Sequence, residues 1–276
     1  MIRRHWGVLR HALSLVFLGT PLAGQSTPPR MDSVVAHDAF AVDSRALGES
    51  RLINVHVPPT YRLTSTVRLP TLYMPDGGMD EDFPHVVRTI DSLIANGVIR
   101  PVIVVGIPNT ERRRDLTGPT RIASDSAIAK HVGGSVAFRR FVRDDVIPAV
   151  EGRYRTTHER AIVGESLAGL FVVETFLLEP TLFQHYVALD PSLWWNAGAL
   201  VDAAPLRLAA LDSVPRTLYM SSSNVADKID GPARLAAMLR AASPRGLAWA
   251  YVPRPDLTHA TIFLGEGPAA LARALR

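Results

Sequence analysis

The sequence predicts an α/β fold with a mostly parallel central sheet, an antiparallel edge near the N-terminus and helices on both faces. From residue 69 onward, short apolar runs alternate with segments of helical spacing, the pattern of parallel strands joined by crossover helices. Two strand-like segments, 40–42 and 52–57, precede this alternation and fit an antiparallel pair. The chain has 276 residues, of which 47% are hydrophobic, enough to bury one large core.

Each element follows from local pattern. The run 102–107 is almost wholly apolar, as expected for a strand covered on both faces. Helical spacing over 83–95 stops at Asn96-Gly97, a C-terminal cap signal. The other expected strands are 69–74, 161–163, 186–189, 217–220 and 247–252, and the other expected helices are 138–150, one ending near 178, 200–211, 232–242 and one from 262 to the C-terminus. No repeat or second domain boundary interrupts this order, so 38–276 is expected to form a single domain.

The N-terminus resembles an export signal. Arg3, Arg4 and Arg10 form a positive front, 12–18 is an apolar centre, and 21–25 is a small-residue exit. We therefore expect a signal peptide at 1–24, a linker at 25–37, and a periplasmic or secreted mature protein. The apolar run is too short for a stable bilayer span, and an uncleaved interfacial anchor is the alternative interpretation. No later segment predicts a membrane span.

Composition excludes several classes of function. The chain has no cysteine, so thiolate chemistry, disulfides and cysteine-ligated metals are excluded. The net charge is +4, and no run of Lys and Arg alternates with aromatic residues, so nucleic acid is not an expected partner. We expect a small-molecule substrate, no metal and no cofactor; the oligomeric state is not predicted.

The most informative stretch is 159–170, where an apolar strand turns sharply into an apolar helix. Ser166 lies at the turn between Gly164 and Ala168, with Gly169 next. A nucleophile elbow needs nearly side-chain-free residues two before and two after its serine, because the serine backbone is strained. The usual pattern ends in glycine, so Ala168 departs from it by one methyl group. The alternative interpretation is an ordinary turn or helix-capping serine.

Partners for this serine follow in the chain. A hydroxyl is a poor nucleophile at neutral pH and needs a neighbouring imidazole to accept its proton. His259, in the loop between the last strand and the last helix, is the candidate. Asp227, after the penultimate strand, is the first candidate for the carboxylate that orients the imidazole; Asp190 is the second, and a dyad without an acid is the third. Serine, acid, histidine is the chain order of the α/β-hydrolases.

The negative oxygen that forms during attack needs preorganised N–H donors. One is the N–H of Leu167, which begins the helix after the elbow. The other is expected from the glycine turn after strand 69–74, at Gly78 or Met79. A plain tight turn is the alternative for this segment and is compatible with the first interpretation.

Two further groups are candidates for substrate binding. Trp194 and Trp195 could wall an aromatic or acyl pocket, or could pack in the core. Arg112, Arg113 and Arg114 lie in a loop beside the expected site and could hold an anionic substrate, with Arg114 the chosen candidate. A solvated basic loop, in which Asp115 pairs with an arginine, is the alternative.

Taken together, these residues resemble the esterase-D/enterochelin-esterase branch of the α/β-hydrolases from about residue 38 to the end. The motifs that carry the resemblance are Leu-Tyr-Met-Pro-Asp-Gly at 72–77, Val-Val-Gly-Ile-Pro-Asn-Thr at 104–110, Arg-Asp-Leu-Thr at 114–117, the elbow, and Pro-Ser-Leu-Trp-Trp at 191–195. The resemblance implies a serine esterase without cofactor that acts on siderophore, thioester-like or simple acyl esters. It assigns Ser166 as nucleophile and His259 as base; because the acid varies in the family, Asp227 stays open.

We therefore expect a serine carboxylic-ester hydrolase that works through an acyl-enzyme. Two other functions fit the same residues. A related acyltransferase would exclude water from the acyl-enzyme, and a non-catalytic siderophore-binding protein would not react with a fluorophosphonate.

Overall fold

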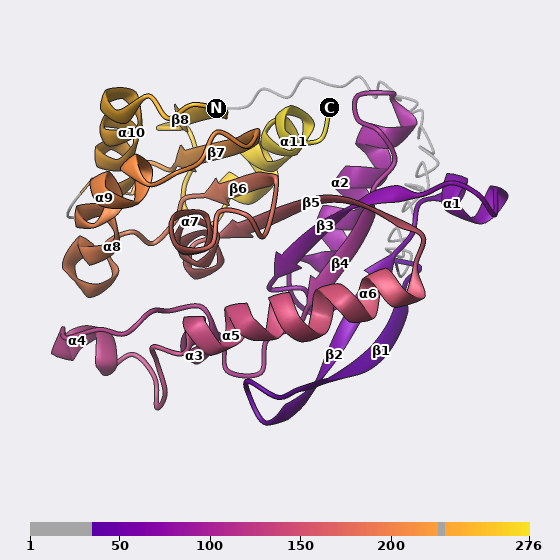
Figure 1. The fold of residues 1–276 in the computed structure, drawn as a ribbon, viewed down its shortest axis with the longest axis horizontal. Helices are drawn as coiled ribbons and strands as arrows, with labels where there is room; N and C mark the ends of the chain where they lie inside the picture. Colours follow the sequence, from indigo (N-terminus) through magenta and orange to yellow (C-terminus); the bar gives the residue numbers. More distant parts are fainter. Residues whose placement is uncertain (1–34, 226–229) are drawn as a thin grey trace, which may run out of the picture. The chain divides into compact units, whose positions relative to one another are not determined.

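The computed structural model describes residues 35–225 and 230–276, which form an eight-stranded sheet with helices on both faces (Figure 1). The strands are β1 (Asp38–Ser44), β2 (Glu49–His56), β3 (Leu69–Pro75), β4 (Ile103–Ile107), β5 (Thr156–Glu165), β6 (His185–Leu189), β7 (Arg216–Ser222) and β8 (Leu247–Pro253). Their order in the sheet is β1-β2-β4-β3-β5-β6-β7-β8. β2 pairs antiparallel with β1 and β4, and all other pairs are parallel. The predicted fold class is therefore confirmed.

The sheet separates two hydrophobic cores, because successive side chains of a strand point to opposite faces. Tyr73 and Val105 join one core, whereas Leu72 and Val104 join the other. The second core is covered by α2 (Phe83–Ala95) and α11 (Ile262–Ala274). The first core is covered by α5 (Ser135–Phe141), α6 (Ile147–Arg153), α7 (Leu167–Leu178), α8 (Ala199–Asp202), α9 (Ala204–Ala209) and α10 (Gly231–Ala242).

Helix α7 lies against the centre of the sheet, in contact with β5 and β6. Its residues 167–177 are all buried, so it is covered on every side and shows no polar face. Because β5 runs directly into α7, the turn between them is fixed by the buried end of a central strand, residues 161–164, and by a fully buried helix.

Proline explains two differences from the predicted elements. The helix predicted at 138–150 extends from Ser135 to Arg153 and contains a π-helical turn at Val142–Val146. Pro148 lacks an N–H and would clash with the preceding turn, and the N–H of Ile147 bonds back five residues to the Val142 carbonyl. The helix predicted at 200–211 is two short helices, α8 and α9, because Pro205 lies in the first turn of the second one, a position that proline favours.

Four short helical segments were not predicted, because none is long enough to show a period. These are α1 (Pro59–Leu63), α3 (Arg112–Asp115), α4 (Ala123–Ser126) and a 3₁₀ turn at Trp195–Gly198. The predicted signal peptide and most of the predicted linker lie outside the described residues. Within the described ranges, no helix is long and apolar enough to cross a bilayer, and no cluster of three potential ligand side chains is arranged around a metal position.

Candidate active site

Ser166 occupies the strained turn that the sequence predicts. It lies between β5 and α7 with φ 59° and ψ −119°, in the left-handed half of backbone space that a non-glycine residue rarely adopts. A Cβ on Gly164 would lie 2.6 Å from the backbone carbonyl carbon of Ala168 and 2.7 Å from its methyl group. The Ala168 methyl therefore fits because Gly164 has no side chain.

His259 brings its ring between the serine and a carboxylate. Its Nε2 lies 3.1 Å from the Ser166 Oγ, and its Nδ1 lies 2.6 Å from the Asp190 Oδ2. The three side chains come from the loops after β8, β5 and β6, at the carboxyl edge of the parallel strands. Loops at this edge can meet although the residues are 93 and 69 positions apart in sequence.

Asp190 is held for this contact by the loop after β7. It has φ 43°, and its carboxylate accepts hydrogen bonds from the Ser223 N–H at 2.9 Å and the Ser223 hydroxyl at 2.6 Å. Burial alone would raise the pKa of Asp190, but the hydrogen bonds from His259 and Ser223 outweigh burial and lower it. Asp190 therefore stays ionised. Asp227, the first candidate acid, lies outside the described residues, and the second candidate makes the hydrogen bond to His259.

The electrostatics around His259 favour its charged form. The hydrogen bond to Asp190 raises the pKa of His259, burial lowers it, and the nearby charge of Glu165 raises it further; the net shift is upward. Glu165 precedes the serine, and burial raises its own pKa to about 7 against the lowering effect of His259. A stabilised imidazolium is what a base needs after it has taken the serine proton.

The N–H groups of the two predicted oxyanion donors, Leu167 and Gly78, differ in whether they already have a hydrogen-bond acceptor. Leu167 is the first residue of α7, and its N–H has no hydrogen-bond acceptor within residues 35–225 and 230–276. The Gly78 N–H instead donates to the Glu81 Oε2 at 2.7 Å. The Met79 N–H, the other donor that the sequence offered, has no acceptor within the same ranges. The available pair is therefore Leu167 and Met79.

Ser166, Asp190 and His259 line a cavity of about 1030 Å³. Its lining includes both polar and apolar side chains, with Trp194 and Ile122 among the apolar ones. Trp194 is 39% exposed, whereas Trp195 is 4% exposed and donates its indole N–H to the Gly118 carbonyl at 2.7 Å. The two tryptophans therefore separate into one cavity residue and one core residue.

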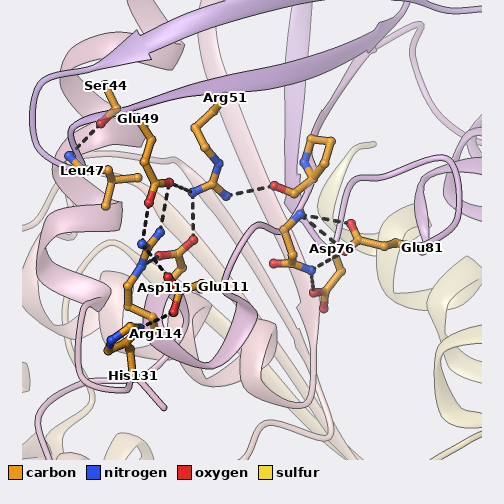
Figure 2. Close-up of polar contacts among 12 residues, drawn as sticks. Ser44, Leu47, Glu49, Arg51, Asp76, Glu81, Glu111, Arg114, Asp115 and His131 are labelled. Atoms are coloured by element: carbon orange, nitrogen blue, oxygen red, sulfur yellow. Dashed lines mark hydrogen bonds and ion pairs between the residues drawn. The ribbon is translucent and has the colours of Figure 1, made fainter. Parts of the chain in front are cut away.

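Arg114 does not line this cavity. Figure 2 shows its guanidinium among the carboxylates of Glu49, Asp115 and Glu111, which it contacts at 2.5, 2.7 and 3.3 Å. Asp115 is fully buried and also accepts a hydrogen bond from Arg51 at 2.9 Å. These ion pairs fix the loop after β4 to β2, so the structure gives Arg114 a structural role in place of the predicted substrate contact. Asp115 pairs with arginine, as predicted.

Sequence reasoning missed Ser223 and Ser192. Ser192 Oγ lies 3.4 Å from Ser166 Oγ, and its N–H donates to the Ser166 carbonyl at 3.0 Å. Both serines follow strand ends, at the edge where the three site residues lie, and this position is the signal that could have found them. The ion pair of Arg112 with Asp76, at 2.7 and 2.8 Å, was missed too, because it joins two loops 36 residues apart.

Comparison with known proteins shows which proteins this chain is similar to. The family model described as "Putative esterase" matches residues 44–230. The ferri-bacillibactin esterase BesA of Bacillus subtilis is 37% identical over 113 residues, 36% of this chain and 39% of that protein. The siderophore triacetylfusarinine C esterase of Aspergillus fumigatus is 31% identical over 171 residues, 57% of this chain and 56% of that protein. The matched regions therefore span less than two thirds of either relative.

Among solved structures, an IroE-like serine hydrolase from Shewanella oneidensis superposes with a TM-score of 0.79 at 25% sequence identity. The match covers 87% of this chain and 80% of that chain. The likeness therefore extends over most of this chain.

Proposed function

The chain belongs to the esterase family, and on that premise we propose that it hydrolyses carboxylic esters through an acyl-enzyme on Ser166. The observation that carries the proposal is the continuous contact from Ser166 through His259 to Asp190. A hydroxyl on a strained turn, with an imidazole at 3.1 Å and an ionised carboxylate behind it, is the arrangement that activates serine for acyl transfer.

The reaction proceeds in two halves. The Ser166 Oγ attacks the ester carbonyl carbon while the His259 Nε2 accepts its proton, and Asp190 stabilises the imidazolium that results. The N–H groups of Leu167 and Met79 stabilise the negative oxygen. The tetrahedral intermediate then expels the alcohol, which takes the proton from His259. In the second half, water attacks the acyl carbon with His259 as base, and the carboxylic acid leaves with Ser166 restored.

We further propose that the substrate is bulky. The cavity volume of about 1030 Å³ lies at the upper end of small-molecule sites, which span about 300–1,000 Å³. Trp194 offers a partly exposed aromatic surface next to the serine-lined wall. One relative is named as a ferri-bacillibactin esterase and another as a siderophore triacetylfusarinine C esterase, and these names support a siderophore-type ester as the substrate.

A panel of p-nitrophenyl esters of graded chain length, together with a siderophore trilactone, tests this function. Wild type is expected to hydrolyse short esters and the trilactone, and Ser166→Ala is expected to hydrolyse neither. Ser192→Ala is the matched control, because it removes a hydroxyl 3.4 Å away from the Ser166 Oγ. Unchanged turnover in Ser166→Ala would disprove the mechanism.

The two other functions give different results in the same assay. An acyltransferase would transfer the acyl group to an added alcohol or sugar in preference to water. A binding protein would bind the trilactone, leave the esters intact and resist labelling by a fluorophosphonate. Mass mapping of the labelled peptide decides whether Ser166 carries the adduct.

We propose in addition that the protein is exported with cleavage of residues 1–24. The motivation is the positive front, apolar centre and small-residue exit of this segment. N-terminal sequencing of the protein recovered from the producing cells tests it, and a retained Met1 would contradict it.

A further inference from the structure

Loop 76–82 leaves the sheet beside the elbow. β3 and β5 are parallel neighbours, and Tyr73 lies opposite Ile162. Continuing that register for three residues brings Asp76 level with Glu165, the residue before Ser166. Neighbouring strands lie about 4.8 Å apart, so the start of this loop is adjacent to the nucleophile.

One carboxylate closes this loop on itself and joins it to the next one. The Glu81 Oε2 accepts the Gly78 N–H at 2.7 Å, and the Glu81 N–H donates to the Gly78 carbonyl at 3.1 Å. The Glu81 Oε1 accepts a hydrogen bond from the Asn109 side-chain amide at 2.6 Å. A Cβ on Gly78 would lie 2.9 Å from the Glu81 Oε2, so glycine is what lets the carboxylate reach the backbone.

Asp76 completes the connection from the other end of the loop. It has φ 56° and is only 6% exposed, and its Oδ1 accepts the same Asn109 amide at 2.5 Å (Figure 2). Arg112 binds both oxygens of Asp76, at 2.7 and 2.8 Å, and compensates its charge. Asn109 therefore lies between two carboxylates, each of which fixes one end of loop 76–82.

The negative charges of Asp76 and Glu81 would oppose the formation of a negative oxygen nearby. The two carboxylates therefore do not stabilise the oxyanion through their charge. Their geometric effect is to hold the loop by contacts on both sides of Met79: the Gly77, Gly78, Glu81 and Asp82 N–H groups all have acceptors, whereas the Met79 N–H has none in the described ranges. Charge-assisted bonds of this kind are shorter and stronger than neutral ones and hold geometry well.

We propose that Glu81 is a positioning residue, whose carboxylate holds loop 76–82 so that the Met79 N–H faces the oxyanion. The proposal rests on the proposed esterase function. The proposal goes beyond that function by assigning a role to a side chain that does not touch the substrate. Asn109 is a second positioning residue, because its side-chain amide holds the carboxylates of Glu81 and Asp76.

The experiment compares Glu81→Ala, Glu81→Gln and Asn109→Ala with wild type on p-nitrophenyl butyrate. Glu111→Ala is the matched control, because it removes a carboxylate from the loop after β4 that binds Arg114 and His131 and has no contact with loop 76–82. Active sites are counted by fluorophosphonate titration, so that kcat refers to folded, reactive enzyme. The inhibition constant of an alkyl boronic acid, whose adduct is tetrahedral, is measured alongside.

Loss of one oxyanion donor costs about 10²–10³ in kcat, and a displaced donor is expected to cost less, about 10- to 100-fold in Glu81→Ala. The KM should stay constant and the boronic acid should bind more weakly by a similar factor. Glu81→Gln, which keeps one acceptor oxygen, should fall between Glu81→Ala and wild type, and Asn109→Ala should follow the same pattern. Glu111→Ala should match wild type.

A merely structural role would lower the melting temperature and the number of titrated sites but leave kcat per site unchanged. That result in Glu81→Ala, or in Asn109→Ala if Glu81→Ala does not fold, would overturn the proposal while wild-type esterase activity stood. A wild type that hydrolyses none of the esters would overturn the esterase function and this proposal together.

Discussion

Two histidines hydrogen-bond to an aspartate within residues 35–225 and 230–276, and only one of these two histidines also contacts a serine hydroxyl. His259 contacts Asp190 at 2.6 Å through Nδ1, and its Nε2 faces the Ser166 hydroxyl at 3.1 Å. His56 contacts Asp91 at 2.9 Å through Nε2, but its Nδ1 is bound to the Ala36 carbonyl at 2.7 Å. The His259 side chain is 46% exposed and the His56 side chain 8%. Both rings have a raised pKa, so charge alone does not distinguish them.

Position in the sheet explains the difference. His56 ends β2, which is antiparallel to its neighbour, and lies opposite Val104 near the start of β4. It therefore lies at the amino edge of the parallel strands, where no elbow forms. His259 follows β8 at the carboxyl edge, where the nucleophile is presented. The two histidine–aspartate pairs therefore differ in the group that contacts the second ring nitrogen, a serine hydroxyl for His259 and a backbone carbonyl for His56, and the place of each histidine in the sheet determines that group.

The largest expected effect is that of removing the imidazole ring of His259, and removal of the His56 ring is the comparison. His259→Ala should lower kcat/KM for p-nitrophenyl butyrate by about 10⁴-fold or more, because the serine loses its base. His56→Ala should leave kcat per titrated site unchanged, because His56 has no contact with the site residues in the described structure. Steady-state kinetics with active-site titration measures both. Equal losses in the two variants would mean that the contact of His259 with Ser166 is not what drives turnover.

The next effect concerns the acid behind His259. Asp190→Asn should lower kcat by about 10²- to 10⁴-fold, because an amide cannot stabilise the imidazolium or hold its tautomer. Asp227→Asn serves as the control that separates the two aspartates named by the sequence, and its kcat should equal that of wild type. A loss in Asp227→Asn with none in Asp190→Asn would assign the acid to Asp227.

The fold and the elbow could be predicted from sequence because both depend on local pattern. Alternating apolar runs and helical spacing determine a parallel sheet, and small residues around Ser166 are required by its own backbone. His259 was identified by its place after the last strand. Each of these inferences needs only neighbouring residues and chain order.

Which aspartate, Asp227 or Asp190, contacts His259 depends on side-chain contacts at the edge of the sheet. The order of residues in the sequence does not predict such contacts. The Asp190 carboxylate is fixed by Ser223, 33 residues later, and Gly78 gives its N–H to Glu81 only because that side chain folds back. The guanidinium of Arg114 could bind an anionic substrate, yet it is paired with the carboxylate of Glu49, which begins β2. Such pairings depend on the packed geometry of loops.

A smaller effect is expected in the pH profile. In the proposed mechanism His259 acts as a base only when neutral, so kcat/KM should rise with pH through the pKa of His259, which lies above its ordinary value of 6.5. Asp190 and Glu165 raise this pKa, and Arg112 lowers it. Glu165→Gln removes one negative charge, destabilises the imidazolium, and should move the acidic limb to lower pH by about 0.5 to 1 unit. An unmoved or upward-shifted limb would show that Glu165 does not act on His259 through its charge.

The smallest effect concerns the stability that the second pair contributes. Burial alone would lower the pKa of His56, but hydrogen bonds with Asp91 and the Ala36 carbonyl outweigh it and raise the pKa above 6.5. A raised folded-state pKa stabilises the fold below the unfolded-state pKa, and this contribution is lost as pH rises through the folded-state pKa. Asp91→Asn should therefore lower the free energy of unfolding by about 0.5–1 kcal/mol near pH 5.5, and by less near pH 9.

Urea denaturation of both forms at the two pH values measures this difference. Asp43→Asn, on β1, is the matched control, since Asp43 is exposed and its carboxylate has no hydrogen bond or ion pair within the described residues. A penalty for Asp91→Asn that is equal at both pH values would mean that the contact stabilises the fold as a neutral hydrogen bond. His56 would then differ from His259 in protonation state as well as in position, and the comparison between the two pairs would rest on charge after all.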